Sequence, residues 1–341
     1  MRTDHFHPGV HRFAVFTACC TFGLLIAGGL VTSTDSGLAV PDWPLSYGQL
    51  MPPMVGGIFY EHGHRMIATF VGILTVILAI ALWRVEKRRW VRVLGFLSLG
   101  AVVTQGVLGG LTVLFLLPTP VSAAHAMLAQ SFFSLTILLA LVTSAAWMQP
   151  SAGVSAMARA TRWFAVSAVF VVLLQLFLGA WMRHSSAGLA IPDFPLTYGT
   201  LLPPMDEGGL AAVNQIRMAW YDMPPVSIGQ IWIHFLHRGG ALVAACVVLG
   251  FGRHILRSYP GESRLREPAI VMMMLILVQL LLGALTVWTG KGVQIATAHV
   301  AVGALLLATT VFVTARVFRF FVLPAAARPP VPALVAEAGA Q

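Results

Sequence analysis

Four histidines occupy matching places in the two halves of this chain. His64 and His125 lie 61 positions apart, and His237 and His299 lie 62 apart. Each histidine falls near the start of a long apolar segment, so the spacing predicts two pairs of imidazoles buried in a membrane. Two imidazoles that face each other at one depth can bind an iron from both sides. The pattern therefore indicates a membrane protein with two haem sites.

A lone histidine inside a membrane is as often a packing or hydrogen-bonding residue as a ligand. Four at repeated positions favour ligands. Zinc fits less well than haem, because no cysteine or second carboxylate completes either pair. Glycines on neighbouring segments leave room for a flat macrocycle, although plain helix packing explains them equally well. These glycines are Gly106, Gly109, Gly110 and Gly283.

An arginine follows the first histidine of each pair. Arg65 comes directly after His64, and Arg238 comes directly after His237. Guanidinium groups at the outer boundary of a membrane can hold haem propionates, so both are propionate candidates. The alternative is that each arginine simply reaches the membrane surface as an interfacial anchor.

The two halves differ one helical turn before these histidines. Glu61 precedes His64 by three residues, whereas His234 stands in that place before His237. This difference predicts that one half carries out a reaction and the other transfers electrons. Glu61 is the catalytic candidate, as a proton acceptor or as the anion that stabilises a developing cation. The alternative is that Glu61 is not catalytic and only carries a negative charge that is favoured at a helix N-terminus.

The composition is that of a polytopic membrane protein. Hydrophobic residues make up 58% of the 341 positions, charged residues make up 10%, and the mean hydropathy is +0.84. The net charge of +9 does not indicate a nucleic-acid partner, because the cations cluster between apolar runs. Eight apolar runs are long enough to span a bilayer, near 13–33, 62–83, 93–117, 121–147, 163–183, 229–252, 268–290 and 293–318.

Lysines and arginines predict the orientation of these spans. Most of them fall at the termini or in the even-numbered connections between spans. Because positive charges stay on the cytoplasmic side, we expect a protein of the cell inner membrane with both termini in the cytoplasm. The long connections 34–61 and 184–228 then lie on the outer face, near the haem sites. Their length and polarity are typical of ordered lids.

An internal repeat divides the chain. GLAVPDWPLSYGQLMPP from Gly37 and GLAIPDFPLTYGTLLPP from Gly188 agree at 12 of 17 positions. We therefore expect an all-α membrane protein of two tandem four-helix bundles in the same orientation, covering 1–155 and 156–323, with a disordered cytoplasmic tail at 324–341. A parallel repeat argues modestly against the inverted repeats of many transporters.

Several motifs resemble those of the haem A synthase family over roughly 12–320. They are GLAVPDWPLSYG, the ExxHR pattern at Glu61, AAHAMLAQ at His125, HFLHR at His237 and TAHVAVGA at His299. The resemblance implies an enzyme that oxidises the C8 methyl group of haem O to a formyl group by successive hydroxylations, giving haem A for cytochrome oxidase. It also implies that Glu61 is needed for activity.

The resemblance further implies which ligand each half binds. His237 and His299 would hold the iron of a haem b cofactor, with Arg238 beside it, and His64 and His125 would hold the iron of the substrate haem O. Some family members carry a cysteine pair in the first outer loop. Here Val40 and Ser46 occupy those approximate places, so this loop is not expected to carry out thiol redox chemistry.

Expected partners are the lipid bilayer, a haem O synthase (a farnesyltransferase) and cytochrome oxidase assembly factors. The sequence does not decide whether the chain forms a homo-oligomer.

Two other functions also fit the residues. A di-haem membrane cytochrome b would pass electrons from a quinol and keep both haems. A haem transporter or chaperone would tolerate loss of Glu61 and produce no formyl group.

Overall fold

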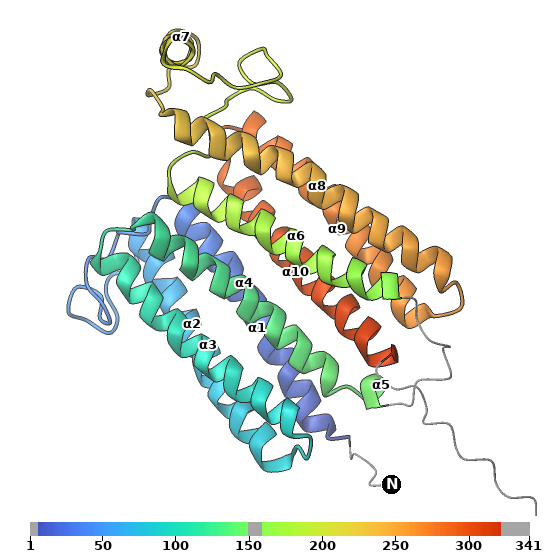
Figure 1. The fold of residues 1–341 in the computed structure, drawn as a ribbon. Coiled ribbons are helices and arrows are strands. Elements are labelled where there is room, and N and C mark those ends of the chain that lie inside the picture. Colours follow the sequence, from blue (N-terminus) through green and yellow to red (C-terminus); the bar gives the residue numbers. More distant parts are fainter. Residues whose placement is uncertain (1–5, 149–158, 322–341) are drawn as a thin grey trace, which may run out of the picture.

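Eight long helices lie roughly side by side in the computed structural model, which describes residues 6–148 and 159–321 (Figure 1). In this described part, all eight are long and apolar enough to cross a membrane. The predicted all-α membrane fold is therefore confirmed. The helices are α1 (Pro8–Ser33), α2 (Gly56–Val85), α3 (Arg89–Leu114), α4 (Thr119–Val142), α6 (Arg159–His184), α8 (Ile228–Ser258), α9 (Ser263–Trp288) and α10 (Val293–Phe321).

The long helices form two groups of four. We call α1–α4 unit 1 and α6 with α8–α10 unit 2; within each unit every helix contacts two others in a ring. The units meet where α4 packs on α6 and α10, and where α1 packs on α10. An apolar cluster across this junction contains Leu25, Phe133, Ala304 and Ala308. The predicted boundary between 155 and 156 and the tail 324–341 lie outside the described residues.

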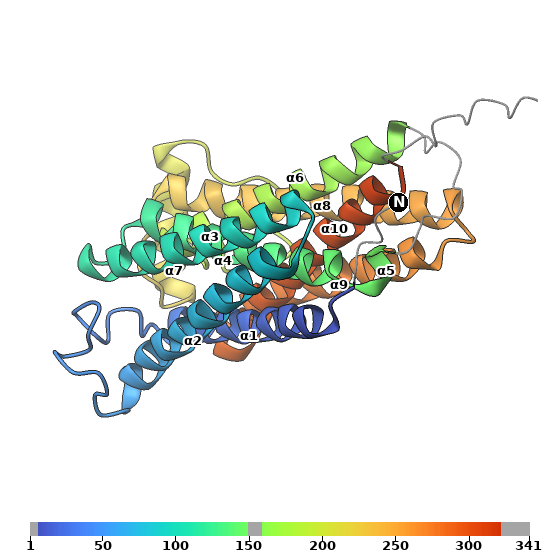
Figure 2. The ribbon, with the colours of Figure 1, turned by 90° about the horizontal axis from the view of Figure 1, so that it is seen from below.

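Both long connections lie at one end of the bundle, which we call the loop end (Figure 1). The helices still lie along a common direction when seen from below (Figure 2). The described N-terminal residues and the short helix α5 (Ala145–Met148) lie at the opposite end. The loop end is therefore where α2, α4, α8 and α10 begin.

Two of the predicted span limits need correction. Helix α2 begins at Gly56 rather than near 62, because the chain leaves Pro53 and enters the helix through a glycine with a φ of +51°. Glu61 and His64 therefore lie well inside a helix. Helix α4 ends at Val142 rather than near 147, since the Thr143 and Ser144 amides bond back to Leu139 and Leu141 and turn the chain into α5.

The sequence analysis did not predict helix α7 (Glu207–Trp220) in the second long connection. Two glycines in its first turn, Gly208 and Gly209, disfavour a helix. The carboxylate of Asp206 compensates by accepting a hydrogen bond from the Gly209 amide, and this caps the helix. Arg217 is buried and donates to the carbonyls of Leu189 and Pro224, so α7 is fixed to the loop beneath it.

Candidate functional site

The four repeated histidines all lie near the loop end of the bundle. Each is six to nine residues past the first residue of its helix, which is about 9–14 Å along the axis at a rise of 1.5 Å per residue. In unit 2 the ring centroids of His237 and His299 are 6.5 Å apart. That separation leaves room for one metal ion bound from both sides through bonds of about 2 Å.

A glycine on the adjacent helix lies against each imidazole. A methyl group added to the glycine would come within 2.9 to 3.3 Å of the ring, so a larger residue would displace it. The pairs are Gly28 with His64, Gly109 with His125, Gly179 with His237, and Gly283 with His299. Of the glycines named from the sequence, Gly106 faces open space and Gly110 lies against Trp43.

Three glutamines also contact these histidines, and sequence reasoning missed them. Each amide Nε2 donates to the backbone carbonyl of a histidine at 2.9 to 3.0 Å and lies within 3.5 Å of its ring. The pairs are Gln105 with His125, Gln175 with His237, and Gln279 with His299. The signal was present, because each glutamine precedes a histidine-facing glycine by four residues.

Several polar atoms at these sites are buried without a hydrogen-bond partner in the described structure. They are Nδ1 of His125 and His299 and Oε1 of Gln105, Gln175 and Gln279. Buried polar atoms usually have a partner, and clusters of exceptions mark sites that bind something. Together with the glycines that lie against the rings and the facing imidazoles of His237 and His299, they fit a haem bound by two histidines.

The predicted catalytic residue, Glu61, lies in a buried hydrogen-bond network in unit 1. Only 4% of it is exposed. Its Oε2 accepts from the Val40 amide at 2.8 Å, and its Oε1 accepts from Arg65 at 2.6 Å. Arg65 also donates to the carbonyls of Asp42 and Leu45. Arg65 therefore holds the first long loop over unit 1 and neutralises Glu61.

Unit 2 has the same arrangement with an imidazole in place of the carboxylate. The His234 Nδ1 lies 3.2 Å from the Ile191 amide, and its Nε2 lies 3.2 Å from Arg238 Nε. A neutral imidazole has one acceptor nitrogen for these two donors, whereas a carboxylate serves both. Arg238 donates to the carbonyls of Asp193 and Leu196, so it also holds its loop. Within residues 6–148 and 159–321, Arg238 has no carboxylate partner equivalent to Glu61.

One aspartate in each long loop fixes a turn. Asp42 accepts from the amides of Gly48 at 2.9 Å and Tyr47 at 2.6 Å. These two bonds, that from Gly48 first, hold the pKa of Asp42 below its ordinary value. The second loop repeats the turn with Asp193, Tyr198 and Gly199. Both loops are therefore ordered by the same local contacts.

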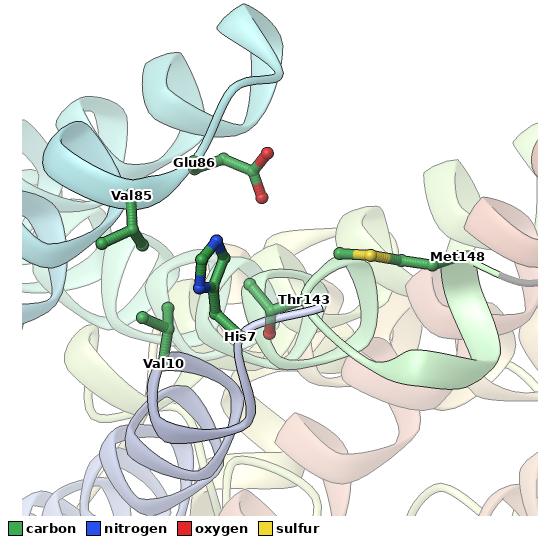
Figure 3. Close-up of a pocket in the computed structure, with 6 residues that line it drawn as sticks. All are labelled: His7, Val10, Val85, Glu86, Thr143 and Met148. Carbon is green, nitrogen blue, oxygen red and sulfur yellow. The ribbon is translucent and has the colours of Figure 1, made fainter. Parts of the chain in front are cut away.

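The histidines outside the two pairs have other environments. His62 is buried near the start of α2, and its Nδ1 lies 2.8 Å from the Ser46 hydroxyl. At the opposite end of the bundle His7 lines a small cavity with Glu86 and Thr143 (Figure 3). That cavity holds about 10 Å³, room for about one water molecule, and it cannot contain a porphyrin.

Comparison with known proteins identifies similar chains. The model of the COX15-CtaA family, described as cytochrome oxidase assembly protein, matches residues 11–56 and 56–311. A haem A synthase of Halalkalibacterium halodurans is 27% identical over 317 residues, covering 90% of this chain and 96% of that protein. The haem A synthase of Shouchella clausii is 29% identical over 290 residues, with coverages of 83% and 88%. That of a Chelativorans strain is 27% identical over 323 residues, covering 84% of each chain.

Proposed function

We propose, because the chain belongs to the COX15-CtaA family of cytochrome oxidase assembly proteins, that it is a haem A synthase. It is then a membrane oxidoreductase that oxidises the C8 methyl group of haem O to a formyl group by successive hydroxylations. The observation that carries this proposal is the asymmetry between two otherwise matching histidine pairs. One pair has a buried carboxylate one turn away, and the other has an imidazole there.

The asymmetry supports a different ligand for each unit. His64 and His125 bind the iron of the substrate haem O in unit 1, next to Glu61. His237 and His299 would bind the iron of a haem b cofactor in unit 2, where His234 stands in the place of Glu61. A bound haem b supplies one-electron redox chemistry. The protein keeps both sites beneath ordered loops and so limits the access of water.

Glu61 acts on the substrate from a fixed position. Its oxygens are held by the Val40 amide and by Arg65, and this keeps the carboxylate oriented. From there it accepts a proton released at the reacting methyl group or stabilises positive charge that develops on it. Arg65 and Arg238 bind propionates through the guanidinium N–H groups that do not donate to loop carbonyls.

The loop end is proposed to face the outer side of the cell inner membrane, with both termini in the cytoplasm. This orientation follows from the excess of lysine and arginine at the termini and in the short connections of the opposite end. Substrate haem O enters from the bilayer, supplied by a haem O synthase, and cytochrome oxidase assembly factors receive the product. The first loop has Val40 and Ser46 in place of a cysteine pair, so these steps involve no thiol in that loop.

The test is to express the chain together with a haem O-producing enzyme and to identify the extracted haems by mass and pyridine haemochrome spectrum. Haem A should appear with the parent chain and be lost with Glu61→Gln, while haem b is retained in both. Two haem b molecules per chain, unchanged by the substitution, would instead identify a di-haem electron-transfer cytochrome.

A further inference from the structure

Arg183 lies on α6 at the outer end of the unit 2 site. It follows Gly179 by four residues, and Gly179 lies against the ring of His237. Residues four apart share one face of a helix, and at a rise of 1.5 Å per residue Arg183 is about 6 Å nearer the loop end than that glycine. The arginine therefore projects from the face of α6 that meets His237, one turn closer to the outer surface.

The guanidinium group of Arg183 lies at the junction of the two units. Its Nη2 donates to the Ser33 hydroxyl of α1 at 2.9 Å and to the Gly29 carbonyl at 3.4 Å. The hydroxyl of Thr297 on α10 donates to the same Ser33 oxygen at 3.1 Å, and Thr297 precedes His299 by two residues. The guanidinium is thus held beside the start of α10, close enough to His299 to interact with it electrostatically.

No protein anion matches the charge of Arg183 in the part of the chain that the structure describes. It forms no ion pair there, and the exposed carboxylate of Asp35 interacts with it only at longer range. Both of its hydrogen bonds to described residues use Nη2, so Nε and Nη1 are left to donate to another group. A partly buried cation is costly unless its charge and its N–H groups find partners. Arg183 is therefore placed to receive an anion that the protein itself does not supply.

The internal repeat shows that this cation belongs to unit 2 alone. In the alignment of the two long loops, Thr32 corresponds to Arg183 and Gly28 corresponds to Gly179. The Thr32 hydroxyl donates to the Gly28 carbonyl of its own helix at 3.1 Å. Unit 1 therefore has a neutral side chain, already hydrogen-bonded, at the place where unit 2 has a guanidinium.

We propose that Arg183 binds a propionate carboxylate of the haem in unit 2 through the N–H groups that it does not donate to α1. This inference rests on the proposed function, under which that haem is the retained haem b. A hydrogen bond between a guanidinium and a carboxylate is roughly twice as strong as one between neutral groups. Because the same guanidinium donates to Ser33, it also ties the retained haem to unit 1.

The experiment measures how fast the full-length, haem-loaded protein loses haem to an excess of apomyoglobin. The chains carry His125→Ala, so that only the unit 2 pair holds an iron from both sides. One sample contains haem b, and the other contains the dimethyl ester of haem b, whose propionates carry no charge. Arg183→Gln should accelerate the loss of haem b about tenfold or more, the usual contribution of a hydrogen bond between charged groups. With the dimethyl ester, Arg183→Gln and the parent should release at the same rate.

Two further variants separate the carboxylate from the junction. Ser33→Ala removes the acceptor on α1 but keeps the guanidinium, so haem b should be lost at the parent rate. Arg183→Lys keeps the charge without the planar fork of donors and should give an intermediate rate with haem b and the parent rate with the ester. The lysine variant decides the question if Arg183→Gln does not assemble.

The inference is overturned if Arg183→Gln releases haem b at the parent rate. It is also overturned if the substitution accelerates loss of the ester as much as loss of haem b, or if Ser33→Ala has the same effect as Arg183→Gln, since Arg183 would then act only on the contact between the units. The proposed function is judged separately by the formation of haem A. Should the parent form no haem A and yet the unit 2 haem respond to these substitutions as expected, the role of Arg183 stands and the enzymatic proposal fails.

Discussion

Units 1 and 2 share a frame and differ in where they place their polar side chains. Both have the aspartate-fixed loop, the arginine that binds it and the glycine behind each histidine. Unit 1 has a carboxylate, Glu61, that accepts hydrogen bonds from the first loop and from Arg65. Unit 2 has the imidazole of His234 in that place, and Gln175 lies against the ring of His237. Under the proposed function, one frame then serves the reaction in unit 1 and retention of the cofactor in unit 2.

The largest expected effect separates Glu61 from its counterpart. Glu61→Gln keeps an acceptor for the Val40 amide but loses the charge, so haem A formation should fall about 10²- to 10⁴-fold, the usual contribution of a general acid or base. His234→Gln should lower it less than about tenfold. The measurement is the initial rate of haem A formation in membranes. Equal losses in the two variants would contradict the division of roles.

The glycines behind the ligands should show a similar separation by site. Gly179→Ala places a methyl group against His237 and should weaken haem b binding by about 1–3 kcal/mol, the usual cost of overpacking. Gly28→Ala should spare haem b and weaken substrate binding instead. Gly23→Ala is the matched control on α1, because an added methyl group there meets nothing within 4 Å. Haem content of the purified variants is measured by haemochrome spectra; a loss of haem b in the control would refute this explanation.

Replacing His234 by glutamate, the residue that unit 1 has at this place, should change the cofactor's redox potential. His234→Glu adds a negative charge beside Arg238, and negative charge favours the oxidised iron. The reduction potential of haem b should therefore fall by on the order of 50 mV, close to a tenfold change for a one-electron couple. His234→Gln serves as the uncharged control. Potentiometric titration followed by absorbance checks this, and identical potentials in the two variants would rule it out.

The smallest effect concerns acid sensitivity of the first loop. Its amide bonds lower the pKa of Asp42 below the ordinary 3.8, so the stabilisation of the loop is complete above that value and is lost as the pH falls through the lowered one. The protection of residues 41–50 against hydrogen exchange, measured relative to the intrinsic exchange rate at each pH, should therefore fall at acidic pH in the parent. Asp42→Asn should exchange faster at neutral pH and show no further acid step. A parent-like acid step in that variant would assign the effect to another group.

Features that depend on one segment alone were predictable from the sequence. Apolar length gave the spans, and duplication identified the four histidines and the difference between Glu61 and His234. Contacts between segments were not predictable in the same way. Gln175 reads as one polar residue in an apolar run, and its role depends on which face of α6 meets α8. Helix α7 was missed because its stability comes from Arg217 and a cap rather than from helix propensity.

The roles of the two arginines illustrate the same limit. The sequence places Arg65 and Arg238 directly after His64 and His237, which suggests that they bind propionates. Only the fold shows that the carbonyls of the long loops, up to 47 residues away in sequence, already accept most of their hydrogen bonds. Loop closure brings these groups together, and no local pattern at the arginines encodes it.

The central claim is that unit 1 holds the substrate and unit 2 holds the cofactor. The most direct measurement is the identity of the haem retained by His125→Ala and by His299→Ala, each purified from cells that make haem O. We predict that His125→Ala keeps haem b and loses haem O and haem A, whereas His299→Ala loses haem b. Retention of haem O by His125→Ala together with loss of its haem b would reverse the assignment and contradict the account.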